Sequence, residues 1–172
     1  IWVNLPAKHK MMAPRYQEIP EADSPTVEHD GVWARVIAGE CLGVTSSIDT
    51  VIPISLIHVK MEEGAVLNQT IASGLNGMIY VFRGSIRVND QLSVRKQPMP
   101  FGIGIKQQVS DGELALLSDG ETVEITCDSP CDLLILAGPE IDEPIARYGP
   151  FVMNTREEIH QAVIDYQNGT FA

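Results

Sequence analysis

Histidine is the side chain best suited to metal chemistry, and the chain has four of them, His9, His29, His58 and His160. Imidazole and carboxylate groups hold iron, manganese or nickel when they converge on one point. The four histidines lie far apart, and no two have the short spacing of a ligand pair. His58 falls in an alternating segment, where a hydrogen-bonded structural histidine is the more frequent case. The histidines therefore predict no metal site.

Cysteine offers two further kinds of chemistry, disulfide formation and zinc binding. Cys127 and Cys131 are four positions apart, but no second Cys or His pair completes the usual zinc site. No secretion signal is recognisable from Ile1 onward, because a basic start and a long apolar stretch are missing. We therefore expect reduced thiols and a cytoplasmic protein, or a nuclear one if the organism is eukaryotic.

Other catalytic signatures are missing from the sequence. No Gly-rich loop precedes Lys and Ser or Thr, and no Gly-x-Ser-x-Gly elbow occurs. Gly102-Ile103-Gly104 is too short for a dinucleotide-binding loop and follows no strand–helix pattern. The sequence predicts no catalytic and no cofactor-binding residue.

Charge and composition limit the partners. The 172 residues include 23 acidic and 12 basic side chains, a formal net charge of -11. No stretch concentrates Lys and Arg, which argues against direct binding to nucleic acid. No apolar run approaches the roughly 20 residues that a membrane helix needs.

Most of the chain has the pattern of β-strands separated by turns. Segments rich in Val, Ile and aromatic residues predict strands at Val32–Ala38, Ile52–Met61, Met78–Phe82, Ile86–Asn89, Leu114–Ser118, Thr122–Cys127 and Asp132–Ala137. Arg83-Gly84 and Asp119-Gly120 predict tight turns between paired strands. Loops are expected at 17–30, 99–108 and 138–149. This spacing of strands favours a barrel or a sandwich.

One helix is expected, near residues 156–167. Thr155 and Glu158 have the spacing of a capping box. An apolar stripe follows at Ile159, Ala162, Val163 and Tyr166. Asn168-Gly169 is a stop signal, since Gly adopts the left-handed cap conformation without strain. His160 lies off this stripe, so we expect it to face solvent.

The barrel pattern invites a test for the cupin metal motif, which places two His, a Glu and a third His inside the barrel. Aligned from Gly64, the His positions of the first motif fall on Thr70 and Ala72, and the Glu position falls near Asn76. The last His position falls on Val123. None of the four can serve as the expected ligand, so the sequence predicts a cupin-like barrel without its metal.

Segments at both ends resemble the pirin family. Ile1–Pro6 and Pro14–Gln17 are similar to the passage between the two barrels of these proteins, and Val36–Glu40 to the opening of the second barrel. Gly149–Thr155 and the helix after it resemble the C-terminal signature. The resemblance spans the chain and is weak only near residues 89–110. It implies the C-terminal cupin domain of a bicupin.

The resemblance also implies a domain organisation. Residues 1–30 would form an interdomain strand and linker, residues 31–150 a metal-free jelly-roll cupin barrel, and residues 151–172 a C-terminal helix and tail. The N-terminal cupin domain, which holds iron in this family, would be absent from this chain. The expected partner is that domain or a second copy, through Trp2, Phe151 and the helix after Thr155.

Three functions follow from these expectations. Pirins resemble iron-dependent quercetin 2,3-dioxygenases, so this chain would be the supporting half of such an enzyme. Animal pirins are also transcriptional coregulators, which implies an interaction module as the alternative. A weaker possibility is a small-ligand pocket inside the emptied barrel, apolar except for Thr70 and Asn76.

Overall fold

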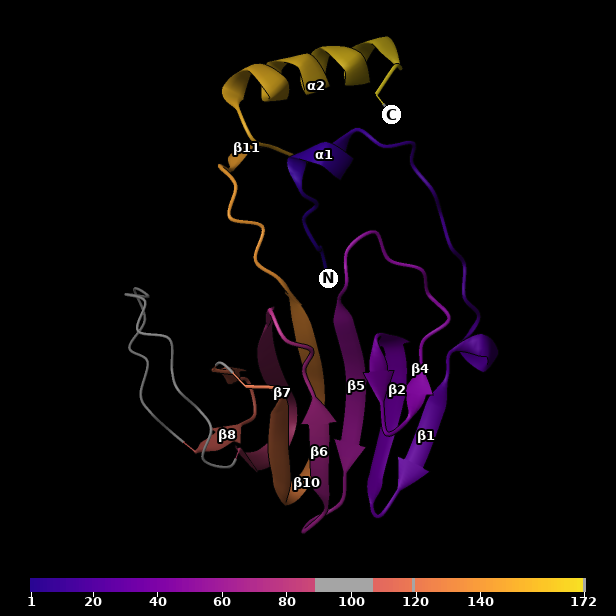
Figure 1. Ribbon diagram of the computed structural model, residues 1–172, viewed down its shortest axis with the longest axis vertical. Helices are drawn as coiled ribbons and strands as arrows, with labels where there is room; N and C mark the ends of the chain where they lie inside the picture. The colour runs from indigo at the N-terminus through magenta and orange to yellow at the C-terminus, as the bar shows by residue number, and fades with distance from the viewer. Residues whose placement is uncertain (89–106, 119, 172) are drawn as a thin grey trace. The chain divides into compact units, whose positions relative to one another are not determined.

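The computed structural model describes residues 1–88, 107–118 and 120–171. These residues form two compact units, each of which is described by itself. The larger unit comprises residues 19–139, and the smaller unit combines residues 1–18 with residues 140–172. Figure 1 labels the elements of both units.

The larger unit is built on an eight-stranded antiparallel sheet. Its strands are β1 (Thr26–His29), β2 (Val32–Ala38), β5 (Ser55–Met61), β6 (Val66–Thr70), β7 (Leu75–Val88), β8 (Gln108–Ser110), β9 (Leu114–Leu116) and β10 (Thr122–Pro139). A separate hairpin of β3 (Glu40–Cys41) and β4 (Val44–Thr45) and a short 3-10 helix, η1 (Glu21–Asp23), complete the unit.

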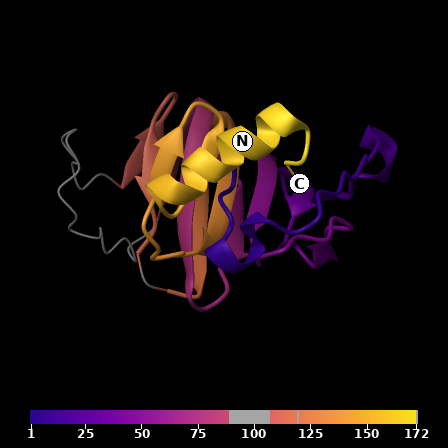
Figure 2. The same cartoon turned by 90° about the horizontal axis from the view of Figure 1, so that it is seen from above.

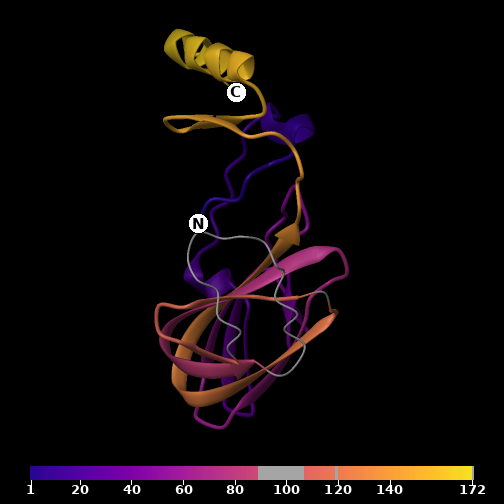
Figure 3. The same ribbon diagram turned by 90° about the vertical axis from the view of Figure 1, so that its left-hand side faces the viewer.

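Two long strands, β7 and β10, belong to two layers at once. The last part of β10, Cys131–Ala137, pairs with β5, whereas its first part, Thr122–Thr126, pairs with β6. In the same way β7 pairs with β9 at Met78–Tyr80 and with β8 at Ser85–Arg87. One layer is therefore β1-β2-β5-β10-β7-β9 and the other is β6-β10-β7-β8, and Figure 3 shows the sheet curving back on itself.

This arrangement corrects the predicted strands and one predicted turn. Arg83-Gly84 lies inside β7 and is not a hairpin turn, so Met78–Phe82 and Ile86–Val88 are parts of one strand. Likewise β10 joins the two strands predicted on either side of Pro130. Register shifts between Cys127 and Leu133 let β10 bend while its ladder with β7 continues. The mostly β, cupin-like fold is confirmed, although hydrogen bonding among the described residues does not close the sheet into a barrel.

The core lies between the two layers, as strict alternation of burial indicates. Every second residue of β2 from Val32 to Ala38 is buried, β5 and β6 alternate in the same way, and β10 does so on either side of its bend. The largest fully buried side chains are all branched aliphatics, among them Ile57, Leu67, Ile79, Ile125, Leu133 and Ile135. A dry core of this kind fixes which face of each strand points inward.

Several predicted segments differ from the structure. The predicted linker 17–30 includes η1 and also β1, which pairs with β2. The predicted N-terminal strand is absent, since residues 1–6 have no regular structure, and the loop predicted at 138–149 includes β11 (Ala146–Tyr148). The prediction for β5 began three residues early. Asn89, Asp119 and residues 99–106 of the loop predicted at 99–108 lie outside the described residues.

The smaller unit contains four elements. They are a one-turn helix, α1 (Ala7–Lys10), the hairpin of β11 and β12 (Phe151–Met153), and the long helix α2 (Arg156–Asn168). Glu143 connects the two ends of the chain within this unit, because its Oε2 accepts from the Ala7 amide at 2.7 Å and from Asn154 Nδ2 at 2.8 Å.

The predicted helix is confirmed at both ends. In α2 the Thr155 hydroxyl accepts from the Glu158 amide, and the Glu158 carboxylate accepts from the amides of Asn154 and Thr155. These two amides lower the pKa of Glu158. Gly169 ends the helix in the left-handed conformation, with φ 70°. Figure 2 shows α2 as one uninterrupted helix.

Replacing Gly84 tests the bend of β7. Gly84 has φ 79°, and a β-carbon there would overlap the Pro130 carbonyl oxygen and approach Cys131 Cα to 2.9 Å. Gly112 has almost the same backbone, φ 78°, but open space around it. In both Ala variants the left-handed backbone should lower the free energy of unfolding by about 1–2 kcal/mol. In Gly84→Ala the steric overlap should lower it by about 1–3 kcal/mol more. Urea unfolding measures both, and equal losses would contradict this account.

Candidate functional site

The inner face of β6 occupies the place where the cupin motif would put its first metal ligands. Leu67, Gln69 and Ile71 are buried there, whereas Thr70 and Ala72 are exposed. Thr70 and Ala72 therefore lie on the outer face, and a slip of one residue in the alignment, which exchanges the two faces of a strand, brings the motif onto the inner face. Gln69 and Ile71 are the residues that point inward.

Gln69 is the polar group of this inner face. It is only 4% exposed, and it lies opposite Val123 of β10, which is also buried. Its amide nitrogen donates to the carbonyl oxygens of Glu40 and Thr70, both at 2.9 Å. The Gln69 amide therefore attaches the β3–β4 hairpin to the inside of the sheet. Asn76, the expected Glu position, is half-buried and opposite Gly138.

These inner residues do not fit a transition metal. An amide committed to backbone carbonyls, with the aliphatic side chains of Ile71 and Val123, supplies neither the imidazole nor the carboxylate that iron or nickel prefers. Within residues 1–88, 107–118 and 120–171, no group of three His, Cys, Asp or Glu side chains is placed to hold a metal ion. We derive no metal-dependent step from this chain.

His58 lies on the outer face of the sheet, in a small polar cluster. Its Nε2 is 3.2 Å from Asp132 Oδ1, and Arg83 Nε is 3.2 Å from the other oxygen of Asp132. The imidazole lies between Trp33 and Phe82, at ring distances of 5.4 and 5.6 Å. His58 is thus a paired structural residue, which agrees with the prediction. Asp132, 7% exposed, thus has one carboxylate oxygen beside His58 and the other paired with the Arg83 guanidinium.

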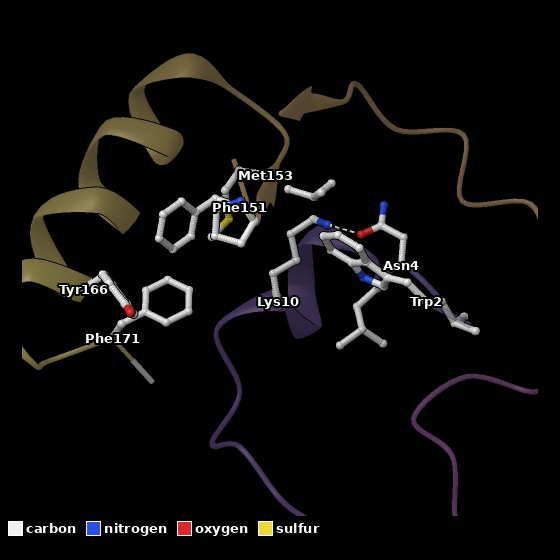
Figure 4. A pocket seen from close by; sticks show the side chains of 11 residues that line it. Trp2, Asn4, Lys10, Phe151, Met153, Tyr166 and Phe171 are labelled. Atoms are coloured by element: carbon white, nitrogen blue, oxygen red, sulfur yellow. Dashed lines mark hydrogen bonds between the residues drawn. The ribbon is translucent and has the colours of Figure 1, made fainter. Parts of the chain in front are cut away.

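The smaller unit contains an aromatic pocket of about 390 Å³. Figure 4 shows Phe151, Tyr166 and Phe171 along one side, and Trp2, Asn4 and Lys10 along the other. Phe151 makes edge-to-face contacts with Tyr166 at 5.8 Å and with Phe171 at 5.4 Å. The predicted contact residues Trp2 and Phe151 and the helix after Thr155 therefore meet in one pocket.

One cation lies at this pocket. Lys10 Nζ donates to Asn4 Oδ1 at 2.6 Å, which holds the ammonium group beside the aromatic side chains. The last residue of the predicted apolar stripe, Tyr166, is 67% exposed and not packed in a core, while Ala162 is buried. The pocket can accept an apolar group together with an acidic one.

Comparison with known proteins identifies the family. Residues 56–172 match the model of the pirin C-terminal cupin domain. The chain belongs to the pirin family. It is 34% identical to mouse pirin over 170 residues, covering 98% of this chain and 54% of that protein. It is 36% identical to a putative quercetin 2,3-dioxygenase of Vibrio cholerae over 177 residues, covering 99% and 57%.

A solved structure agrees with the fold. The crystal structure of a quercetin 2,3-dioxygenase from Acinetobacter baumannii matches 99% of this chain and 55% of its own, with a TM-score of 0.82 and 30% identity. The chain thus spans about half the length of the curated pirins and dioxygenases that it matches. In the described part of this pirin domain, no helix is both long and apolar enough to cross a bilayer.

Sequence reasoning missed three features of this pirin domain. The inward position of Gln69 was missed because the alignment from Gly64 fixed the wrong face. The pairing of Asp132 with His58 depends on the register of β5 and β10, Leu134 opposite His58, which no local pattern reveals. Lys10 joins the pocket only through a contact between chain ends. The one signal in the sequence was that Gln69 is a polar residue at an alternate position between apolar residues of β6.

The role of Gln69 can be tested with its exposed neighbour as a control. Gln69→Leu leaves the Glu40 carbonyl without its side-chain donor and should lower the free energy of unfolding by about 1–3 kcal/mol. Asn68→Leu, on the exposed face of the same strand, should change it by no more than about 0.5 kcal/mol. Urea unfolding measures both variants. If Gln69→Leu left the free energy of unfolding unchanged, the β3–β4 hairpin would not depend on this amide.

Proposed function

We propose that this chain is the supporting C-terminal half of a two-domain, quercetin 2,3-dioxygenase-like pirin. Its role is to bind and stabilise an N-terminal cupin domain that carries the iron. The smaller unit is the docking surface, with Trp2, Phe151 and α2 at its centre. Catalysis belongs to the complete protein, and no catalytic residue is assigned to this chain.

The observation that carries this proposal is the distribution of exposed apolar side chains. Fifteen large hydrophobic residues of the described chain are exposed, six of them in residues 1–18 and four in residues 140–172, against five in the larger unit. A patch of exposed apolar surface is typical of a protein contact. Trp2 at 62% and Tyr166 at 67% exposure are two of these residues, and both also line the aromatic pocket.

The length of the relatives supports an N-terminal domain as the occupant. Mouse pirin and the Vibrio protein have nearly half of their length outside the match, enough for another domain, and the family model that matches is that of the C-terminal domain. Lys10 beside the aromatic pocket favours a segment of that domain with an apolar side chain next to an acidic one.

The inner face of the sheet supports the assignment of the iron to the N-terminal domain and not to this chain. Gln69, Ile71 and Val123 are buried on this face and offer neither the imidazole nor the carboxylate that iron prefers. Iron is therefore proposed for the N-terminal domain only. Quercetin is proposed as the substrate of the complete protein because two relatives carry quercetin 2,3-dioxygenase in their names.

A fusion protein tests the proposal. The N-terminal domain of the Vibrio relative is joined to Ile1 of this chain, and iron content and quercetin-dependent oxygen uptake are measured. We expect about one iron per fusion and measurable oxygen uptake. The chain alone should show neither. If this chain alone bound a similar amount of iron per molecule, the assignment of the iron to the N-terminal domain would be wrong.

Variants of the fusion test the docking surface. Trp2→Ala with Phe151→Ala should weaken the contact between domains by about 2 kcal/mol or more, because buried aromatics dominate such contacts. The fusion should then unfold in two thermal transitions instead of one. Tyr80→Ala with Phe82→Ala, exposed aromatics of the larger unit, is the matched control and should leave one transition. If both pairs behave alike, the smaller unit is not the docking surface.

One observation favours the alternative, an interaction module of a pirin-like coregulator. On the outer face of the larger unit, Tyr80 lies opposite Leu114, and both are exposed together with Phe82. This second apolar patch suits a protein partner. Partner binding that persists in the isolated, metal-free chain and disappears in the Tyr80→Ala, Phe82→Ala variant would favour this function.

A further inference from the structure

Two buried cysteines face each other at the bend of β10. The sulfur atoms of Cys127 and Cys131 are 3.6 Å apart, and each residue is 2% exposed. Three residues separate them in sequence, and the ladder with β7 changes register across this stretch. The bulge therefore brings together two side chains that a regular strand would keep about 13 Å apart at its rise of roughly 3.3 Å per residue.

A cavity of about 450 Å³ reaches one of these residues. Cys131 lines it together with Met61 and Pro130, and its charged lining residues are Lys60, Arg83 and Glu62, two cationic side chains and one carboxylate. A small neutral oxidant such as a hydroperoxide fits this volume, and cationic groups stabilise the anion that leaves when the O–O bond breaks. The third cysteine, Cys41, is equally buried but does not line this cavity.

The surroundings keep both thiols protonated at neutral pH. Burial, and next the neighbouring Cys127 sulfur, together raise the pKa of Cys131 to about 12. Burial also raises the pKa of Cys127, although Cys131 and the backbone of Ser129 oppose the shift by hydrogen bonding. Because the thiolate is the reactive form, oxidation at neutral pH should be slow and should accelerate with pH.

We propose that Cys127 and Cys131 form a reversible intrachain disulfide when the protein meets a hydroperoxide. One thiolate attacks the peroxide oxygen, which breaks the O–O bond and gives a sulfenic acid and hydroxide. The second thiol then attacks that sulfur, so that the S–S bond forms and water leaves. Two thiols thus lose two electrons and two protons, and hydrogen peroxide is reduced to two molecules of water.

The bond requires a local movement of the bend. A disulfide has sulfur atoms about 2.05 Å apart, so the two sulfurs must approach by about 1.5 Å from their present distance of 3.6 Å. Cys127 would then lose its contacts with the carbonyl oxygens of Ser129 and Met61. Since Gly84 packs against Pro130 and Cys131, the disulfide links oxidation to the bend that joins the two layers.

Counting free thiols tests the proposal. The folded chain is treated with hydrogen peroxide, then denatured and alkylated with N-ethylmaleimide. The untreated chain should take three adducts, one for each cysteine. The oxidised chain should take one, on Cys41, and weigh about 2 Da less before alkylation. Dithiothreitol should restore three adducts, and the rate should rise about tenfold for each pH unit between 7 and 9.

Matched variants define the outcomes. Cys41→Ser removes the thiol that is not part of the pair, so it should keep the mass loss and reach zero adducts. Cys127→Ser and Cys131→Ser should each abolish the mass loss, and near-ultraviolet circular dichroism confirms that they fold. Three adducts after prolonged treatment at pH 9 would overturn the proposal. So would a disulfide that includes Cys41, or one that joins two chains.

Discussion

The bends in β7 and β10 are the constraint on which the larger unit depends. Each strand runs through both layers, so the layers are joined by continuous backbone and not only by side-chain packing. The bends in turn require a very close approach between Gly84 and the segment Pro130-Cys131. Only a residue without a β-carbon permits this approach. The aliphatic core, the inner face of β6 and the cysteine pair all take their positions from these two bent strands.

The same constraint explains why a cupin-like fold persists without the chemistry of a metal site. The layers are held by the bent strands and by branched aliphatic side chains such as Ile79 and Ile135, so no metal is needed to close them. On the inner face of β6, the Gln69 side-chain amide donates to the backbone carbonyls of Glu40 and Thr70. A buried amide that is hydrogen-bonded costs little, whereas an unpaired one would be expensive. The inner face is therefore a structural part of the fold.

Local patterns in the sequence predicted the fold class and α2 but not the long strands. The capping box of Thr155 and Glu158 and the stop at Gly169 act within a few residues, so they can be predicted locally. Arg83-Gly84 has the composition of a turn, yet it forms a bend, because only the partner strand decides between the two. The face of Gln69 and the pairing of His58 with Asp132 depend on register across strands. Contacts between distant segments set that register, so the local spacing of residues cannot predict it.

The two units differ in how much of their own apolar surface they bury. The larger unit buries its aliphatic residues between two layers, and its core needs nothing from outside. The smaller unit is made from both ends of the described chain, and Ala162 and Met153 are its only buried hydrophobic residues, while ten large ones stay exposed. Burial of about 25 cal/mol per Å² is the main source of stability for a unit of this size. A unit with so little core gains little stability from its own apolar burial, and this is the physical reason that supports our proposal of a domain contact at the smaller unit.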